Sequence, residues 1–232
     1  MKKFYLILFC VFLIGIFITM IVQTSTRAVL IEKQAEFPVI VIDPGHGGVD
    51  GGAVAKDGTV EKGINLSISK KLADKFTLLG YKVITTRDSD ISIHDDDANT
   101  IRQKKVTDLH NRLKLAESYD ATLISIHQNN FGQSKYRGTQ VFYGIKNDQS
   151  KLMAEKIQRT VRDLLQPNND REIKPSSKSI YLLHNIKTPA VLVECGFLSN
   201  ADETALLKTD AYQEKLSFAI LCGYVSYQTI RK

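Results

Sequence analysis

The feature that most constrains the fold is an alternation of short apolar runs with helical stretches from residue 37 onward. The run PVIVID at 38–43 is a continuous β-branched segment, typical of a strand buried on both faces. Residues 61–79 have helical spacing, with apolar residues on one face and Gly80 as a stop. This alternation predicts an α/β fold: a single domain with a mostly parallel, twisted sheet covered by helices on both faces.

The rest of the chain divides into further strands and helices of the same kinds. The predicted strands lie at 81–86, 121–127, 138–144, 179–183 and 190–194, and the predicted helices at 107–119, 150–165 and 211–227. Two polar stretches, 88–106 and 166–178, lack periodicity and are predicted to be long loops near one edge of the sheet. Long loops in a compact domain are usually functional or disordered.

The N-terminal region predicts export. Lysines form a basic n-region at 1–3, ahead of an uncharged apolar run at 4–23 (FYLILFCVFLIGIFITMIVQ). About 20 apolar residues span a bilayer, and the lysines keep the preceding end inside. We interpret 4–23 as a signal anchor, with a cleaved signal peptide as the alternative. Residues 24–36 then form a polar linker, and 37–232 form the exported domain.

The net charge and the cysteines argue against a nucleic-acid-binding protein and against a disulfide-stabilised fold. The net charge of +6 is a mild excess with no basic stripe, so no nucleic-acid partner is expected, and an anionic polymer is only slightly favoured. Cys10 lies in the apolar run. Cys195 and Cys222 show no CxxC motif and no disulfide framework, so both are predicted to be reduced residues that pack in the core.

Polar residues stand directly after several predicted strands. His46 lies in the glycine-rich turn that follows the first strand, and His127 and Glu194 each end a later one. Because ligands bind beyond the carboxyl ends of parallel strands, these side chains are expected to converge at one edge of the sheet. Glu61 opens the helix that follows the glycine-rich turn.

Each of these residues also has a plain structural explanation. The turn DPGHGGVDGG at 43–52 lacks the GxGxxG and GK[ST] patterns of phosphate-binding loops, which leaves a simple turn or a loop that presents His46 to a metal. Glu61 can compensate a helix dipole, and His127 can be a hydrogen-bonded core histidine. Together, two histidines and a carboxylate form a donor set that catalytic zinc sites use.

Glu194 ends an apolar strand, where an unpaired charge is costly. A structural glutamate there would need a buried partner, whereas beside a metal both burial and the ion would tune its proton affinity. We therefore predict that Glu194 is catalytic and carries a proton from the attacking water to the leaving group. Cys195, the next residue, should point to the opposite face of the strand and serve packing.

These residues resemble a known family. The segments DPGHGG, SIHxN and PAVLVECGFLSN, with Glu61 between the first two, are similar to the zinc-dependent N-acetylmuramoyl-L-alanine amidases of the amidase-3 type, from about residue 39 to 227. The resemblance implies hydrolysis of the amide bond between N-acetylmuramic acid and L-alanine in peptidoglycan. It also implies one Zn²⁺ per chain, held by His46, Glu61 and His127, with Glu194 as the catalytic glutamate.

The resemblance further implies residues around the substrate. Arg112 corresponds to the family's helix arginine before the third strand, which is structural or contacts substrate. Asn129, in the SIHxN segment, is predicted to contact substrate. His184 follows the strand predicted at 179–183, so the sheet-edge rule places it near Glu194 and predicts that it contacts substrate. In this stretch many family members carry an arginine, whereas this chain has Leu183-His184-Asn185. Gln128 stands where the family commonly has alanine, and it is expected to alter metal retention or substrate fit.

The short chain resembles the spore-cortex amidases of endospore formers, which permit muramic-δ-lactam formation needed for germination. This implies an enzyme at the outer face of the cytoplasmic membrane, in the intermembrane space of a sporulating cell, with an exported activator protein as a candidate partner. Three alternatives stay open: a vegetative autolysin of the same chemistry, a zinc deacetylase or peptidase acting on another amide, and a catalytically silent wall-binding domain.

Overall fold

The computed structural model describes residues 5, 12–21 and 38–230. Residues 12–21 are helical, but the n-region, the linker at 24–36 and much of the predicted anchor at 4–23 lie outside the described residues. In the ranges that the structure describes, no helix is both long and apolar enough to cross a membrane. The chain divides into two units, Met1–Phe37 and Pro38–Lys232, and the second carries the sheet described below.

This unit is built on a six-stranded sheet with the strand order β2-β1-β3-β6-β4-β5. The strands are β1 (Ile40–Pro44), β2 (Val83–Thr85), β3 (Thr122–Asn129), β4 (Gln140–Tyr143), β5 (Lys174–Pro175) and β6 (Ala190–Phe197). Neighbouring strands are parallel except β4 and β6, which run antiparallel. The mostly parallel sheet confirms the predicted fold class.

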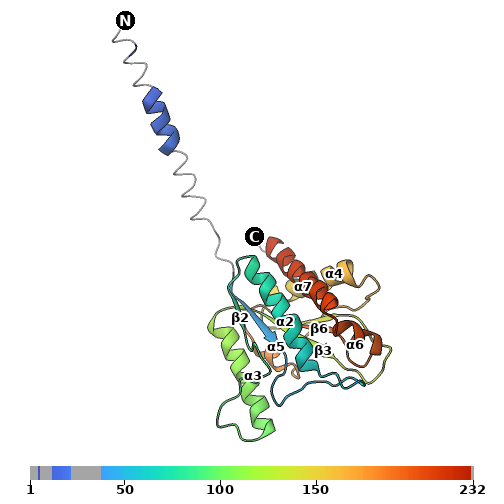
Figure 1. Ribbon diagram of the computed structural model, residues 1–232. Coiled ribbons are helices and arrows are strands. Elements are labelled where there is room, and N and C mark those ends of the chain that lie inside the picture. Colours follow the sequence, from blue (N-terminus) through green and yellow to red (C-terminus); the bar gives the residue numbers. More distant parts are fainter. Residues whose placement is uncertain (1–4, 6–11, 22–37, 231–232) are drawn as a thin grey trace. The chain divides into compact units, whose positions relative to one another are not determined.

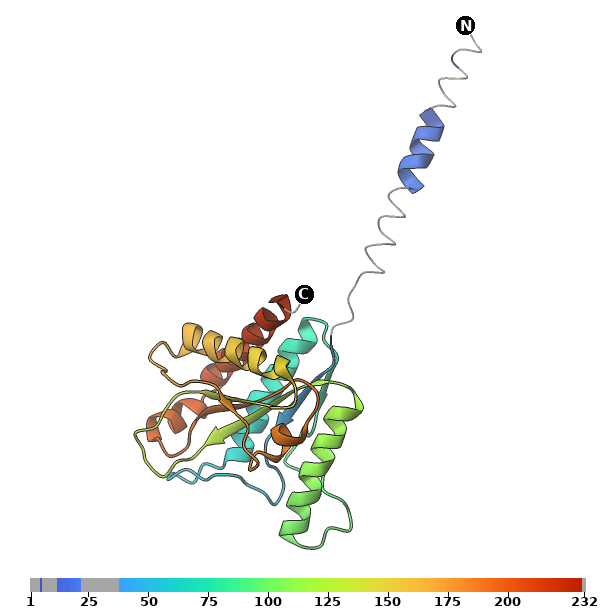
Figure 2. The same ribbon diagram turned by 180° about the vertical axis from the view of Figure 1, so that it is seen from behind.

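Helices cover both faces of the sheet (Figures 1 and 2). One face packs against α2 (Glu61–Leu78), α4 (Asp148–Leu165) and α7 (Asp210–Ile230), and the other against α3 (Ile101–Ser118) and α5 (Tyr181–Asn185). Side chains alternate along β6, so Val193 and Cys195 join the core cluster under α2, α4 and α7, while Leu192 joins the cluster under α3 and α5. Glu194 shares the face of Leu192.

The prediction of a strand at 179–183 is wrong. Residues Tyr181–Asn185 form helix α5, which buries Leu182 and Leu183 against the sheet. An apolar run this short fits either a strand or a helix, so periodicity alone does not decide it. In the folded chain, β4 rather than this segment pairs with the free side of β6.

One helix boundary differs from the prediction, and one further helix is present. Helix α3 begins at Ile101, inside the stretch predicted as a loop, because Thr100 and Gln103 form a capping box that satisfies the first backbone N–H groups. Helix α6 (Ala201–Leu207) was not predicted, and its first turn is capped by the side chain of Asn200. Both signals are present in the sequence but are weaker than the apolar patterns around them.

Candidate active site

The four residues predicted to bind the metal or to act in catalysis lie at the carboxyl edge of the sheet. His127 of β3 and Glu194 of β6 are direct partners in the parallel pairing of these strands. His46 follows β1 in the glycine-rich turn, and Glu61 is the first residue of α2. The tertiary fold therefore brings together four residues that span most of the domain's sequence.

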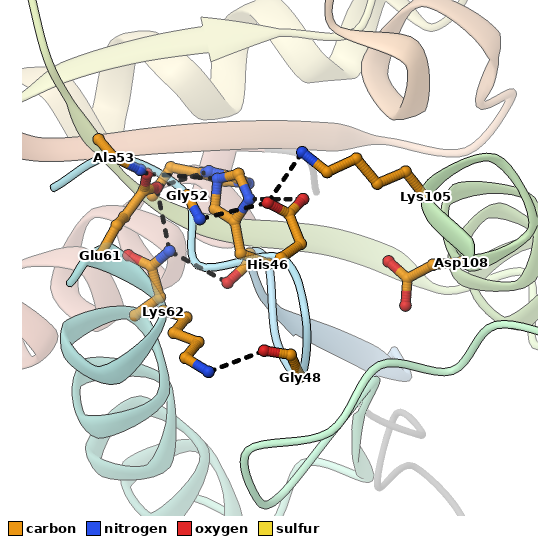
Figure 3. Close-up of polar contacts among 12 residues, drawn as sticks. His46, Gly48, Gly52, Ala53, Glu61, Lys62, Lys105 and Asp108 are labelled. Carbon is orange, nitrogen blue, oxygen red and sulfur yellow. Dashed lines mark hydrogen bonds and ion pairs between the residues drawn. The ribbon is translucent and has the colours of Figure 1, made fainter. Parts of the chain in front are cut away.

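The side chains of His46, Glu61 and His127 converge, and one ligand atom of each lies within 4.8 Å of the others. The Glu61 carboxylate lies between the two rings: its Oε2 is 3.3 Å from His46 Nε2, and its Oε1 is 3.0 Å from His127 Nδ1. The imidazole rings stand edge to face with their centroids 4.9 Å apart. Figure 3 shows His46 and Glu61 facing each other across the turn.

Glycine residues leave the space that this cluster occupies. A Cβ at Gly45 would lie 2.2 Å from His127 Nε2, and a Cβ at Gly52 would lie 2.5 Å from Glu61 Oε2. His46 itself has a φ of 62°, a left-handed conformation that is rare for residues other than glycine and costs about 1–3 kcal/mol. The two imidazoles and the carboxylate suit Zn²⁺, and the glycines keep their surroundings clear, so the residues present fit such an ion.

Hydrogen bonds hold the Glu61 carboxylate in place. Oε2 accepts the backbone N–H of Ala53 at 2.8 Å, while Oε1 accepts the backbone N–H of Gln128 at 3.0 Å and the amide of Asn65 at 3.1 Å. The buried Gln128 side chain donates in turn to Asn65 Oδ1 at 3.1 Å. Burial opposes ionisation, but the hydrogen bonds with the two histidines outweigh it and hold the pKa of Glu61 well below its usual range.

A second carboxylate fixes the His46 ring. Asp50 Oδ2 lies 3.1 Å from His46 Nδ1, and Lys105 of α3 lies 3.0 Å from Asp50 Oδ1. Burial works against the charged imidazole, but the hydrogen bonds with Asp50 and Glu61 raise the pKa of His46 to about 9. A carboxylate on one ring nitrogen leaves the other, Nε2, to face a metal. Asp50 was not expected from the sequence, although it stands four residues after His46 in the same turn.

Glu194 is half-buried, and its Oε2 has no hydrogen-bond partner among the described residues. Burial raises the pKa of Glu194 to about 7; the charge of His127 acts against this rise and that of Glu61 adds to it. A carboxyl group with a pKa near neutrality can both accept and release a proton. The site therefore combines a cluster that could hold a metal ion with a carboxyl group on the adjacent strand that is able to exchange a proton.

Arg112 lies beneath the glycine-rich turn and is only 1% exposed. Its guanidinium is 2.5 Å from Asp43 and 2.7 Å from Asp108, and it donates to the carbonyl oxygens of Pro44 and His46 at 2.9 and 2.8 Å. Burial would raise the pKa of Asp43, but Arg112 and two hydroxyl donors lower it to about 2. Of the two roles left open for Arg112, the structural one fits this position.

The other two residues expected to contact substrate lie in different places. Asn129 is the last residue of β3, half-buried beside Phe197 at the end of β6. His184 belongs to α5 rather than to a strand, and its neighbour Leu183 lies against Gly144 at the amino end of β6. The sheet-edge argument that placed His184 near Glu194 therefore does not apply to it.

A mostly parallel sheet with a His–Glu–His cluster and a poised glutamate at its carboxyl edge has the arrangement of a metal-dependent hydrolase. Residues 40–224 match the amidase-3 family, described as N-acetylmuramoyl-L-alanine amidase. The chain belongs to this family, which confirms the resemblance seen in the sequence and the enzyme class that it implied.

Comparisons with individual proteins support the family assignment. The chain is 38% identical over 192 residues to the germination-specific N-acetylmuramoyl-L-alanine amidase of Bacillus subtilis, covering 82% of this chain and 80% of that protein. It is also similar to the CwlD amidase from Clostridioides difficile, solved in complex with the GerS lipoprotein (42% identity, TM-score 0.80, 83% of this chain and 99% of that one). The amidase LytC of Bacillus subtilis is 32% identical over 212 residues, which are 88% of this chain but 39% of LytC.

Proposed function

We propose that this amidase is zinc-dependent and removes stem peptides from peptidoglycan during spore-cortex maturation, in the step that permits muramic-δ-lactam formation. The observation that carries the chemistry is the convergence of His46, Glu61 and His127 beside Glu194. The cortex role is supported by the similarity to the germination-specific amidase and to CwlD along most of the length of each, whereas LytC is matched over a minor part.

The residues of the chain divide the work of hydrolysis. His46, Glu61 and His127 would hold one Zn²⁺, which, when bound, polarises the scissile carbonyl and activates water. Glu194 accepts the proton of the attacking water and delivers it to the nitrogen of L-alanine as the amide bond breaks. The oxygen of that water remains on the muramic acid side as a carboxylate, and the stem peptide leaves with a free amino group. No covalent intermediate with the enzyme is needed.

The place of action follows from the substrate. We propose that the enzyme works at the outer face of the cytoplasmic membrane, between the forespore and mother-cell membranes in a sporulating cell, held there by residues 4–23. The related CwlD amidase was solved with the GerS lipoprotein, which supports an exported activator protein as a partner of this chain.

Mass spectrometry of muropeptides tests the proposal. Zinc-loaded protein should release peptides that begin with L-alanine, and chelated protein should release none. Acetate release would identify a deacetylase instead, and no cleavage at all would favour a silent wall-binding domain. Spores that lack the enzyme should contain no muramic-δ-lactam, whereas normal lactam levels would favour a vegetative autolysin.

The role of Glu194 has its own test. Glu194→Gln should lower the rate of muropeptide cleavage by about 100- to 10,000-fold, the range attributed to a general acid–base group. Zinc content should stay at one ion per chain, because the metal donors are unchanged. A Glu194→Gln protein that cleaves at the full rate would overturn the mechanism.

A further inference from the structure

Strand β4 carries a second polar side chain on the face of the sheet that holds Glu194. Gln140 is the direct partner of Glu194 in the antiparallel β4–β6 ladder, and opposed residues of such a ladder project to the same face. The buried Gln140 amide donates to the carbonyl of Glu172 at 2.8 Å, and its Oε1 accepts from Arg171 Nη1 at 3.4 Å. Arg171 therefore reaches the face of the sheet on which Glu194 lies.

Aromatic rings and a backbone carbonyl hold the Arg171 guanidinium. Its central carbon lies 4.3 Å from the ring centroid of Phe197 and 5.7 Å from that of Tyr136. Its Nε donates to the backbone carbonyl of Arg137 at 2.6 Å. Phe197 ends β6, three residues after Glu194. Because a guanidinium is planar, stacking on two rings together with a fixed Nε leaves it little freedom to reorient.

Arg171 has no carboxylate at ion-pair distance in the part of the chain that the structure describes. The neighbouring Glu172 instead lies 3.5 Å from Arg162. Glu203 interacts electrostatically with Arg171, but its two carboxylate oxygens accept backbone N–H groups at 2.7 and 2.8 Å. Among the described residues this half-buried, stacked guanidinium has no ion-paired carboxylate, so it is preorganised to bind one, for which its two Nη groups form a fork.

We propose that Arg171 is a substrate-binding residue that receives a carboxylate of the stem peptide, so that the enzyme prefers stems with free carboxylates over amidated ones. This inference rests on the proposed amidase function. In the proposed mechanism His46, Glu61, His127 and Glu194 act at the scissile amide, and Arg171 is not one of these groups. The carboxylate that Arg171 receives accordingly belongs to a part of the peptide beyond the scissile amide.

The test compares two muropeptides that differ only in whether the stem-peptide carboxylates are free or amidated. Zinc-loaded wild-type enzyme should cleave the free-carboxylate substrate with about 10- to 100-fold higher kcat/KM, as expected for charge-assisted hydrogen bonds. Arg171→Ala should abolish this preference by raising KM for the free-carboxylate substrate alone. Arg171→Lys keeps the charge but not the fork, so it should recover only part of the preference.

Controls separate binding from folding. Lys135→Ala removes a neighbouring exposed cation, which lies over the Tyr136 ring at 5.4 Å, and should leave the preference unchanged. Arg171→Met keeps an apolar side chain against the rings and should behave like Arg171→Ala. If the Arg171 variants lower kcat/KM for both substrates equally, or if wild type does not discriminate, the proposal is wrong while the amidase function stands. If wild type cleaves neither substrate, the proposed function fails as well.

Discussion

Replacing Arg112 by methionine tests whether a buried ion pair supports the turn that carries His46. Methionine retains an apolar stem but leaves the Asp43 carboxylate, which is 0% exposed, without its cation. Removing one partner of a buried pair costs about 3–5 kcal/mol, because the remaining charge stays buried. In a domain of this size each kcal/mol lowers Tm by about 2–4 °C, so Tm should fall by about 6–20 °C.

Thermal unfolding followed by circular dichroism of metal-free protein measures this loss. Arg159→Met is the matched control: the Arg159 side chain is 74% exposed and 3.5 Å from Asp163 on the same helix, so its removal should change stability by less than about 1 kcal/mol. Arg112 also donates to the His46 carbonyl, so competition with a chromophoric chelator should show weaker zinc binding in Arg112→Met than in the control.

One result would refute this reasoning. If Arg112→Met unfolds at the wild-type temperature, binds zinc normally and only raises KM for muropeptides, then Arg112 acts on substrate. The ion pair with Asp43 would then be dispensable for the turn, and the other role left open by the sequence would be the correct one.

Three further predictions concern the metal support, the thiol and the response to acid. Asp50→Asn should lower zinc affinity by about 10- to 100-fold in a chelator competition, whereas Asp57→Asn, at an exposed surface ion pair, should not; equal affinities would remove Asp50 from the site. Cys195→Ala should keep full activity, because the thiol is fully buried in the core and burial raises its pKa; an inactive variant with normal zinc content would contradict this. Because the folded-state pKa of Asp43 is lowered from 3.8 to about 2, its contribution of about 2 kcal/mol is complete above about pH 4 and is lost as the pH falls toward 2. A Tm series over this range should therefore be flatter for Asp43→Asn than for wild type, and parallel curves would exclude the effect.

The sequence by itself determined the fold class and the group of residues at the carboxyl edge. Strand and helix periods are local properties of the chain, and parallel strands bring their ends to one edge whatever connects them. His46, His127 and Glu194 could therefore be grouped from the sequence, and Glu61 joined them as the carboxylate that completes a zinc donor set. The segment at 179–183 could not be assigned, because a short apolar run suits both periods and only packing against the second core cluster made it a helix.

Only the tertiary structure decided what the other charged residues contact. Arg112 meets Asp43 across 69 residues of sequence, and Arg171 meets Gln140 across 31. Asp50 is close in sequence to His46, but their contact is made in a turn where His46 has a left-handed backbone conformation. The periodicity of a segment indicates which face of a helix or strand a residue occupies. It does not indicate which distant group lies against that face, so the partners of buried charged residues are determined only by the tertiary fold.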